Sequence, residues 1–111
     1  MRRSVHRFFS SVKMSPASLV DAAIAEHKVV VFSKTTCGYC NSAKRLLDSK
    51  HVSYKVFELN NRNDGAEIQD YLAQKTGQYT VPSIFIKRSH IGGSSDLSAL
   101  NSRGKLDALL V

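Results

Sequence analysis

The chain has 111 residues, of which 42% are apolar and 23% charged, a composition typical of one small globular domain. Its longest apolar run, residues 29–32, is far too short to span a membrane, and two cysteines are too few for a disulfide-stapled miniprotein. The formal net charge of +7 raises the question of nucleic acid binding. We expect no such binding, because basic and acidic residues are interspersed along the body of the chain.

Residues 1–13 differ from the rest of the chain, because they are rich in Arg and Ser and contain no acidic residue. The apolar residues of this segment fall on one helical face: Val5, Phe8, Phe9 and Val12. This pattern favours a mitochondrial presequence that directs the protein to the matrix, and a disordered basic tail is the alternative. Translation from Met14 would give a cytoplasmic form without the segment. We expect the folded domain over residues 14–111.

The first predicted elements are a helix and a buried strand. Ser15 followed by Pro16 supplies an N-cap and a first helical position, and apolar residues at helical spacing follow, so we expect a helix over about 16–26. Residues 28–32 form a β-branched run without polar alternation. Such a run is typical of a strand that is buried on both faces, and we expect it at the centre of a sheet.

A βαβ unit follows from the next two elements. Apolar residues at helical spacing predict a helix over about 39–49, and residues 54–59 predict a second strand. Another helix begins at Asp64 and Gly65 and ends at Gly77, since glycine is a common residue at helix C-termini.

The pattern changes in the last third of the chain. Residues 83–86 and 89–91 are two short apolar strands separated by two residues, which predicts an antiparallel hairpin. Ser94 or Ser95 would then cap a final helical stretch that is broken near Gly104. This order of elements predicts an α/β fold with a four-stranded mixed sheet flanked by helices. We expect the sheet to be mostly parallel and to finish with the antiparallel pair.

Both cysteines lie in the motif Cys37-Gly38-Tyr39-Cys40, which follows the first strand and opens a helix. The unpaired N–H groups of the helix N-terminus and the positive charge of Lys34 should lower the pKa of Cys37. Cys40 lies one turn further on, within reach of a disulfide with Cys37 but turned toward the interior. The sequence therefore predicts Cys37 as a nucleophile and Cys40 as its resolving thiol.

Other interpretations of the CxxC motif have less support. Inert buried cysteines are common, but a CxxC motif within a βαβ unit favours redox chemistry. A zinc site needs four ligands, and the four histidines show no paired spacing that would complete it. A structural disulfide would close too short a loop to stabilise the chain much.

Four segments, of which the first contains the CxxC motif, form a longer sequence pattern along the chain. They are residues 33–40 (SKTTCGYC), 67–69 (EIQ), 76–86 (TGQYTVPSIFI) and 90–97 (HIGGSSDL). With these segments the chain resembles the glutaredoxins over nearly all of residues 15–111. Thioredoxins match less well, because the chain has no Trp before Cys37 and has Tyr39 where they have Pro. The resemblance implies a thioredoxin-like fold and glutathione as the small-molecule partner.

At one end of the implied glutathione site, the resemblance places Lys34 and Gln69 at the glycine carboxylate, with Tyr39 flanking the groove. A cation suits this carboxylate. Taken alone, Gln69 is equally well explained as an exposed helix residue.

At the other end of the site, the resemblance assigns backbone pairing with the cysteinyl part to Thr80, Val81 and Pro82, with a cis Val81–Pro82 bond. Ser95 and Asp96 would hold the γ-glutamyl end, at a helix N-terminus that favours an anion. Taken alone, Asp96 is equally well explained as an acid that stabilises only its own helix.

The resemblance implies an enzyme, a glutathione-dependent thiol–disulfide oxidoreductase that reduces protein–glutathione mixed disulfides and protein disulfides as a monomer. One departure from the family pattern is Gly38, where many dithiol glutaredoxins have Pro. Among glutaredoxins, replacement of that Pro is associated with a [2Fe–2S] cluster held between two subunits by the first Cys of each and two glutathiones. A cluster scaffold or carrier, with Cys37 as the metal ligand in a homodimer, is therefore the alternative function.

Overall fold

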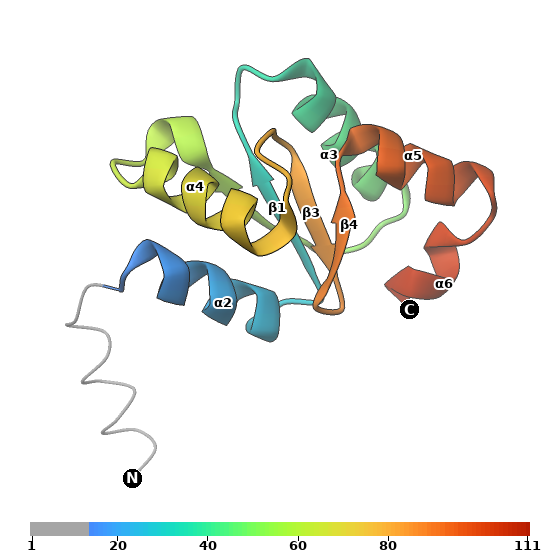
Figure 1. Ribbon diagram of the computed structural model, residues 1–111. Coiled ribbons are helices and arrows are strands. Elements are labelled where there is room, and N and C mark those ends of the chain that lie inside the picture. The colour runs from blue at the N-terminus through green and yellow to red at the C-terminus, as the bar shows by residue number, and fades with distance from the viewer. Residues whose placement is uncertain (1–13) are drawn as a thin grey trace, which may run out of the picture.

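The computed structural model describes residues 14–111, so the presequence expected over residues 1–13 lies outside the described part of the chain (Figure 1). No helix within the described residues combines the length and apolar character that a bilayer crossing needs. The elements, in chain order, are α2 Pro16–Glu26, β1 Val29–Ser33, α3 Gly38–Ser49, β2 Lys55–Glu58, the 3-10 helix η1 Leu59–Asn61, α4 Gly65–Thr76, β3 Ser83–Ile86, β4 Ser89–Gly92, α5 Ser94–Ser102 and α6 Leu106–Leu110.

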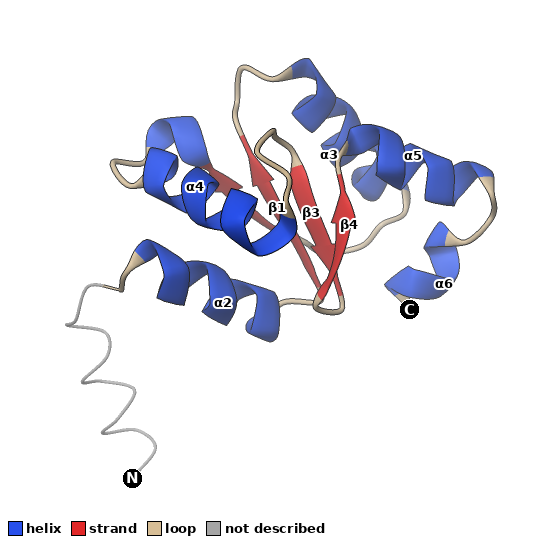
Figure 2. Ribbon diagram, viewed as in Figure 1, coloured by secondary structure: helices blue, strands red, loops and turns tan. Residues whose placement is uncertain are grey.

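The four strands form one mixed sheet in the order β2-β1-β3-β4, which confirms the predicted fold class and the inner position of β1 (Figure 2). Strands β1 and β2 pair in parallel, with Val31 opposite Val56, whereas β1–β3 and β3–β4 are antiparallel. The expectation of a mostly parallel sheet is therefore wrong. Strand β3 starts at the end of the sheet where β1 and β2 finish. All of its residues are buried, so its sequence does not indicate whether it runs parallel or antiparallel to β1.

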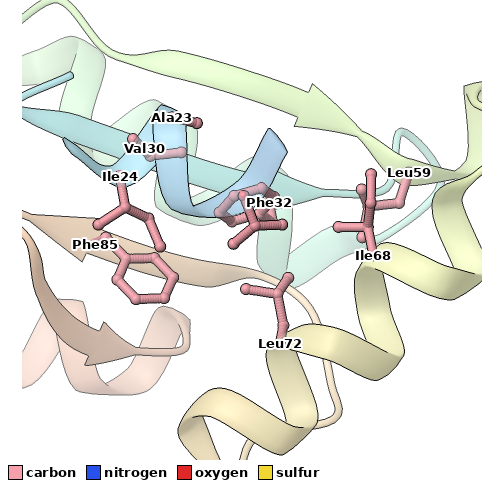
Figure 3. Close-up of a cluster of buried hydrophobic side chains, with 9 residues drawn as sticks. Ala23, Ile24, Val30, Phe32, Leu59, Ile68, Leu72 and Phe85 are labelled. Atoms are coloured by element: carbon pink, nitrogen blue, oxygen red, sulfur yellow. The ribbon is translucent and has the colours of Figure 1, made fainter. Parts of the chain in front are cut away.

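Helices cover both faces of the sheet, and each face has its own hydrophobic core (Figure 1). Helices α2 and α4 pack on one face, and α3, α5 and α6 pack on the other. In the first core, Phe32 of β1 stacks on Phe57 with ring centroids 5.3 Å apart. Phe32 also meets Phe85 edge-on at 6.0 Å (Figure 3). Val29 and Val31 of the same strand point into the second core. Strand β1, buried throughout, thus supports both layers and the loop that follows it.

Local signals define the ends of two helices as predicted. Helix α2 begins after Ser15, whose Oγ accepts the backbone N–H of Ser18 at 3.1 Å. Helix α4 ends at Gly77, which has a φ of 82° and therefore lies in the left-handed region that glycine tolerates best.

The start of α5 differs from the prediction that Ser94 or Ser95 caps it. The N-cap is Gly93, whose backbone N–H donates to the Asp96 carboxylate at 2.9 Å. The acid in the first turn thus accepts the N–H of the N-cap residue, which is the reciprocal bond of a capping box, and neither serine is the N-cap. The predicted break near Gly104 separates α5 from α6.

Candidate active site

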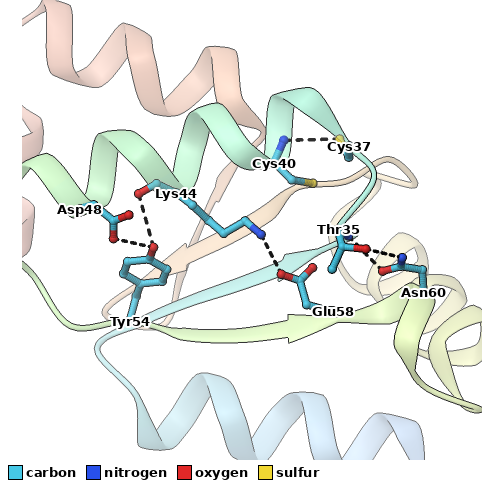
Figure 4. Close-up of polar contacts among 8 residues, drawn as sticks. All are labelled: Thr35, Cys37, Cys40, Lys44, Asp48, Tyr54, Glu58 and Asn60. Carbon is cyan, nitrogen blue, oxygen red and sulfur yellow. Dashed lines mark hydrogen bonds and ion pairs between the residues drawn. The ribbon is translucent and has the colours of Figure 1, made fainter.

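Cys37 and Cys40 lie at the start of α3, just beyond the end of β1 (Figure 4). Cys37 is the N-cap residue of the helix, and its Sγ accepts the backbone N–H of Cys40 at 3.4 Å. Cys37 is partly exposed, whereas Cys40 is fully buried beneath the helix, and both are free thiols. One sulfur is therefore open to a substrate and the other is held one turn behind it.

The two thiols have opposite pKa shifts. Burial raises the pKa of Cys37, but hydrogen bonds from the thiol and N–H of Cys40 and from the N–H of Tyr39, with the charge of Lys34, outweigh it and lower the pKa below its ordinary value. Burial dominates at Cys40 and raises its pKa. The thiolate therefore forms first on Cys37, as the helix N-terminus predicts.

A groove of about 860 Å³ opens next to Cys37. Its walls are the loop from α4 to β3, strand β4, the first turn of α5, and Tyr39 from α3. The Cys37 Sγ lies 3.8 Å from the carbonyl oxygen of Val81, which belongs to this wall. The Val81–Pro82 peptide bond is cis, as expected. A molecule lying along the Val81 wall of the groove would thus pass close to the Cys37 sulfur.

The groove brings together six of the eight residues predicted to bind glutathione. They are Tyr39, Thr80, Val81, Pro82, Ser95 and Asp96. The other two do not line it. Lys34 lies at the end of β1 and acts on Cys37 through its charge. Gln69 of α4 donates its amide N–H to the Tyr79 carbonyl oxygen at 2.6 Å, so it binds a residue of the groove wall without lining the groove itself.

Gln78 and His90 also line the groove, and no role is predicted for either from the sequence, although both lie in the quoted segments. The Gln78 Nε2 donates to the carbonyl oxygens of Thr80 at 3.0 Å and Pro82 at 2.7 Å, and the His90 Nε2 lies 2.9 Å from the Gln78 Oε1. Burial lowers the pKa of His90, although the charge of Asp96 opposes the shift. These contacts join a loop to a distant strand, so no local sequence pattern reveals them.

Polar contacts near the cysteines join α3 to β2 and the loop before α3 to η1 (Figure 4). The Lys44 ammonium pairs with the Glu58 carboxylate at 2.7 Å, and both side chains are largely buried. The Thr35 N–H donates to the Asn60 Oδ1 at 3.0 Å, and the Asn60 amide N–H donates back to the Thr35 Oγ1 at 2.7 Å. The loop that carries Cys37 is therefore fixed at both ends.

Residues 14–111 contain no group of three or more His, Cys, Asp or Glu side chains that could hold a metal ion. A metal cluster at Cys37 would therefore need ligands beyond those that residues 14–111 bring together there. The surface next to it is open, because a Cβ placed on the exposed Gly38 would have no neighbour within 4 Å.

The Glutaredoxin family model matches residues 29–91 of the chain. A glutaredoxin of Ricinus communis is 52% identical over 87 residues, which cover 78% of this chain and 85% of that protein. Glutaredoxin-C1 of Arabidopsis thaliana is 49% identical over 87 residues, covering 78% of this chain and 70% of that protein. Among solved structures, the buckwheat glutaredoxin–glutathione complex has a TM-score of 0.84 at 40% identity, covering 86% of each chain.

Proposed function

Because the chain belongs to the glutaredoxin family and is a glutathione-dependent thiol–disulfide oxidoreductase, we propose that Cys37 is its nucleophile and the adjacent groove its glutathione site. One observation carries this assignment: the Cys37 Sγ, with a lowered pKa, lies 3.8 Å from the Val81 carbonyl oxygen in the groove wall. The buckwheat structure, described as a complex with glutathione, supports the same ligand here.

The monothiol route needs only Cys37. Its thiolate attacks the glutathione sulfur of a protein–glutathione mixed disulfide, a Cys37–glutathione bond forms, and the protein leaves as a thiolate that takes up a proton. A second glutathione thiolate then attacks the bound glutathione sulfur. This step releases glutathione disulfide and regenerates the Cys37 thiolate, which is the better leaving group because its pKa is lowered.

The dithiol route uses Cys40 on protein disulfides. After Cys37 has formed a mixed disulfide with the substrate protein, the Cys40 sulfur attacks the Cys37 sulfur, the second substrate thiol leaves, and a Cys37–Cys40 disulfide forms. Two glutathiones then reduce that disulfide and are released as glutathione disulfide. Burial and the raised pKa of Cys40 keep it protonated until Cys37 has reacted.

Glutathione would lie along the groove with its cysteine next to Cys37. The Val81 backbone, between Thr80 and Pro82, would pair with the cysteinyl part as an added strand does. The N–H groups at the start of α5, with Ser95, favour the γ-glutamyl carboxylate, and Asp96 favours its ammonium.

The glycine end of glutathione would meet the opposite side of the site. Tyr39 flanks the groove, and Lys34 supplies the positive charge for the glycine carboxylate. Gln69 would act indirectly here, because its amide is engaged by the Tyr79 carbonyl.

Two cysteine variants test the proposed roles. Cys37→Ser should abolish turnover of a glutathionylated peptide, whereas Cys40→Ser should retain much of it, because the monothiol route needs only the first thiol. A coupled assay with glutathione, glutathione reductase and NADPH measures both. Equal loss in the two variants would contradict the assignment.

We also propose a second function, binding of a [2Fe–2S] cluster between two copies of the chain. The observation that favours it is the open surface at Cys37, where Gly38 and Tyr39 are both exposed. Cys37 of each copy would supply one thiolate, and two glutathiones would supply the others. Anaerobic reconstitution with iron, sulfide and glutathione tests this, with absorbance and size as readouts. A colourless monomer would exclude it.

Mitochondrial import is a further proposal, and its support is the Arg- and Ser-rich, acid-free sequence of residues 1–13. Relatives named mitochondrial and chloroplastic both match the chain, so their names do not decide the compartment. A fluorescent fusion of the full chain should enter mitochondria, and a fusion that starts at Met14 should stay in the cytoplasm. The same location for both fusions would refute the presequence.

A further inference from the structure

The backbone edge of the groove formed by Thr80, Val81 and Pro82 is bound by the side chain of Gln78. Its Nε2 donates to the carbonyl oxygens of Thr80 and Pro82, at 3.0 and 2.7 Å. These two residues flank Val81, whose own carbonyl faces the Cys37 sulfur. Thr80 is exposed, whereas Val81 packs against the first core and Pro82 is buried. Packing therefore holds the Val81 and Pro82 side chains, and the two hydrogen bonds from Gln78 set the direction of the backbone carbonyls on either side of Val81.

The orientation of the Gln78 amide follows from its partners. Both backbone carbonyls can only accept hydrogen bonds, so the amide nitrogen must face them and the Oε1 must face His90. The His90 Nε2, 2.9 Å from this oxygen, must therefore carry the proton. A flipped amide would lose two hydrogen bonds to the carbonyls and the one to the imidazole.

His90 is itself fixed to the core of the sheet. Its ring lies against that of Phe85, with centroids 5.1 Å apart, and Phe85 is buried in the core under α2 and α4. A continuous set of contacts thus runs from the core through His90 and Gln78 to the Thr80 and Pro82 carbonyls.

We propose that Gln78, oriented by His90, is a positioning residue for glutathione that fixes the direction of the Val81 backbone N–H and C=O groups. A groove edge that is fixed before binding loses little conformational freedom when the ligand pairs with it, and this strengthens binding. The inference rests on the proposed function, because it requires glutathione to lie along this edge. It adds a role for two side chains that do not contact the reacting sulfurs.

The variant Gln78→Met tests the proposal, because methionine has a similar length and makes no hydrogen bonds to the two carbonyls. We expect the KM for a glutathionylated peptide to rise roughly tenfold, with a smaller change in kcat, since binding and not the thiolate is affected. The rate at which iodoacetamide alkylates Cys37 should stay unchanged. The groups that lower the Cys37 pKa belong to α3 and Lys34, not to the loop that Gln78 binds.

Two further variants complete the experiment. His90→Phe keeps a ring against Phe85 but removes the Nε2–H, so it should raise the KM less than Gln78→Met does. Gln74→Met is the matched control, because Gln74 is exposed on α4 and outside the groove, and it should leave KM unchanged. Thermal unfolding of each variant checks that it is folded. If Gln78→Met is not folded, the KM of His90→Phe tests the positioning role instead.

Three outcomes would overturn the inference or its premise. An unchanged KM in Gln78→Met would remove the positioning role. A rise in KM together with equal falls in kcat and in the rate of Cys37 alkylation would show a general distortion of the site. This outcome would also remove the positioning role. If the unmodified protein itself shows no saturation with the glutathionylated peptide, then the proposed function fails, independently of Gln78.

Discussion

The sulfur atoms of Cys37 and Cys40, three residues apart, differ in chemistry because only Cys37 occupies the N-cap of α3. The Cys37 Sγ takes the place of the oxygen that a serine or aspartate would present to the first N–H groups of the helix. An anion is favoured there, whereas Cys40 is surrounded by the core under α3. Backbone geometry thus determines which thiol reacts first.

The charge of Lys34 contributes to this difference, and a variant measures how much. Lys34→Met should raise the pKa of Cys37, because it removes a positive charge that lowers it. The charge is the smallest of the named causes, so we expect a shift of less than about one unit. The pH dependence of Cys37 alkylation by iodoacetamide, followed by mass spectrometry, gives the value. Lys55→Met, at the far end of β2, is the control, and equal pKa values in both variants would exclude a role for Lys34.

At the scale of elements, Tyr54 ties the start of β2 to α3. Its hydroxyl donates to the Asp48 Oδ1 at 2.7 Å (Figure 4), and burial together with this contact raises its pKa to about 12 from an ordinary 10.0. The folded state thus favours neutral Tyr54. Its contribution to stability is complete below pH 10 and is lost as the pH rises from about 10 to about 12.

The direction of this pKa shift predicts how Tyr54→Phe changes the stability of the protein with pH. The variant should lose about 1 kcal/mol of stability at neutral pH with the hydrogen bond, and its difference from the unmodified protein should shrink as the pH rises from about 10 to about 12. Urea unfolding of both proteins across that range measures the difference, and the comparison cancels the titration of the lysines. A difference that grows with pH would show that the hydroxyl is ionised in the folded state.

Helix α4 approaches η1 closely at Gly65, which is buried. A Cβ at this position would overlap the Leu59 carbonyl oxygen, so Gly65→Ala should cost about 1–3 kcal/mol through a forced backbone shift. Gly38→Ala is the matched control, because Gly38 also begins a helix but a Cβ there meets nothing. Urea unfolding midpoints measure both. Equal midpoints for the two variants would mean that η1 can move aside at no cost.

At the scale of the whole molecule, the parts that the sequence predicts correctly depend on local chemistry. The pair Ser15-Pro16 marks the start of α2, and Gly77 marks the end of α4, because each acts on its own backbone. The direction of β3 could not be predicted, because a strand buried on both faces carries no mark of its neighbours' direction. It depends instead on where the long connection from β2 returns to the sheet.

The site follows the same division between local and long-range chemistry. The pKa order of Cys37 and Cys40 follows from their place in one helical turn, and the sequence predicts it. The contacts of Gln78 with His90, and of Gln69 with the Tyr79 carbonyl, arise only when loop, strand and helix meet in space. A match to the family's motifs identifies such residues, but only the structure shows which groups they contact.

Both layers share β1, so the molecule should unfold as one unit. Phe32 is completely buried between Phe57 and Phe85, and Phe32→Ala should cost about 3–5 kcal/mol, a large part of the 5–15 kcal/mol that stabilises a typical domain. Cys40 is a buried residue of α3, the helix that packs on the opposite face of the sheet, so its alkylation rate reports on the other layer. In the variant, circular dichroism and Cys40 alkylation should give the same lowered unfolding midpoint in urea. If Cys40 kept its protection after the helical signal began to fall, the two layers would unfold separately, and β1 would not couple them.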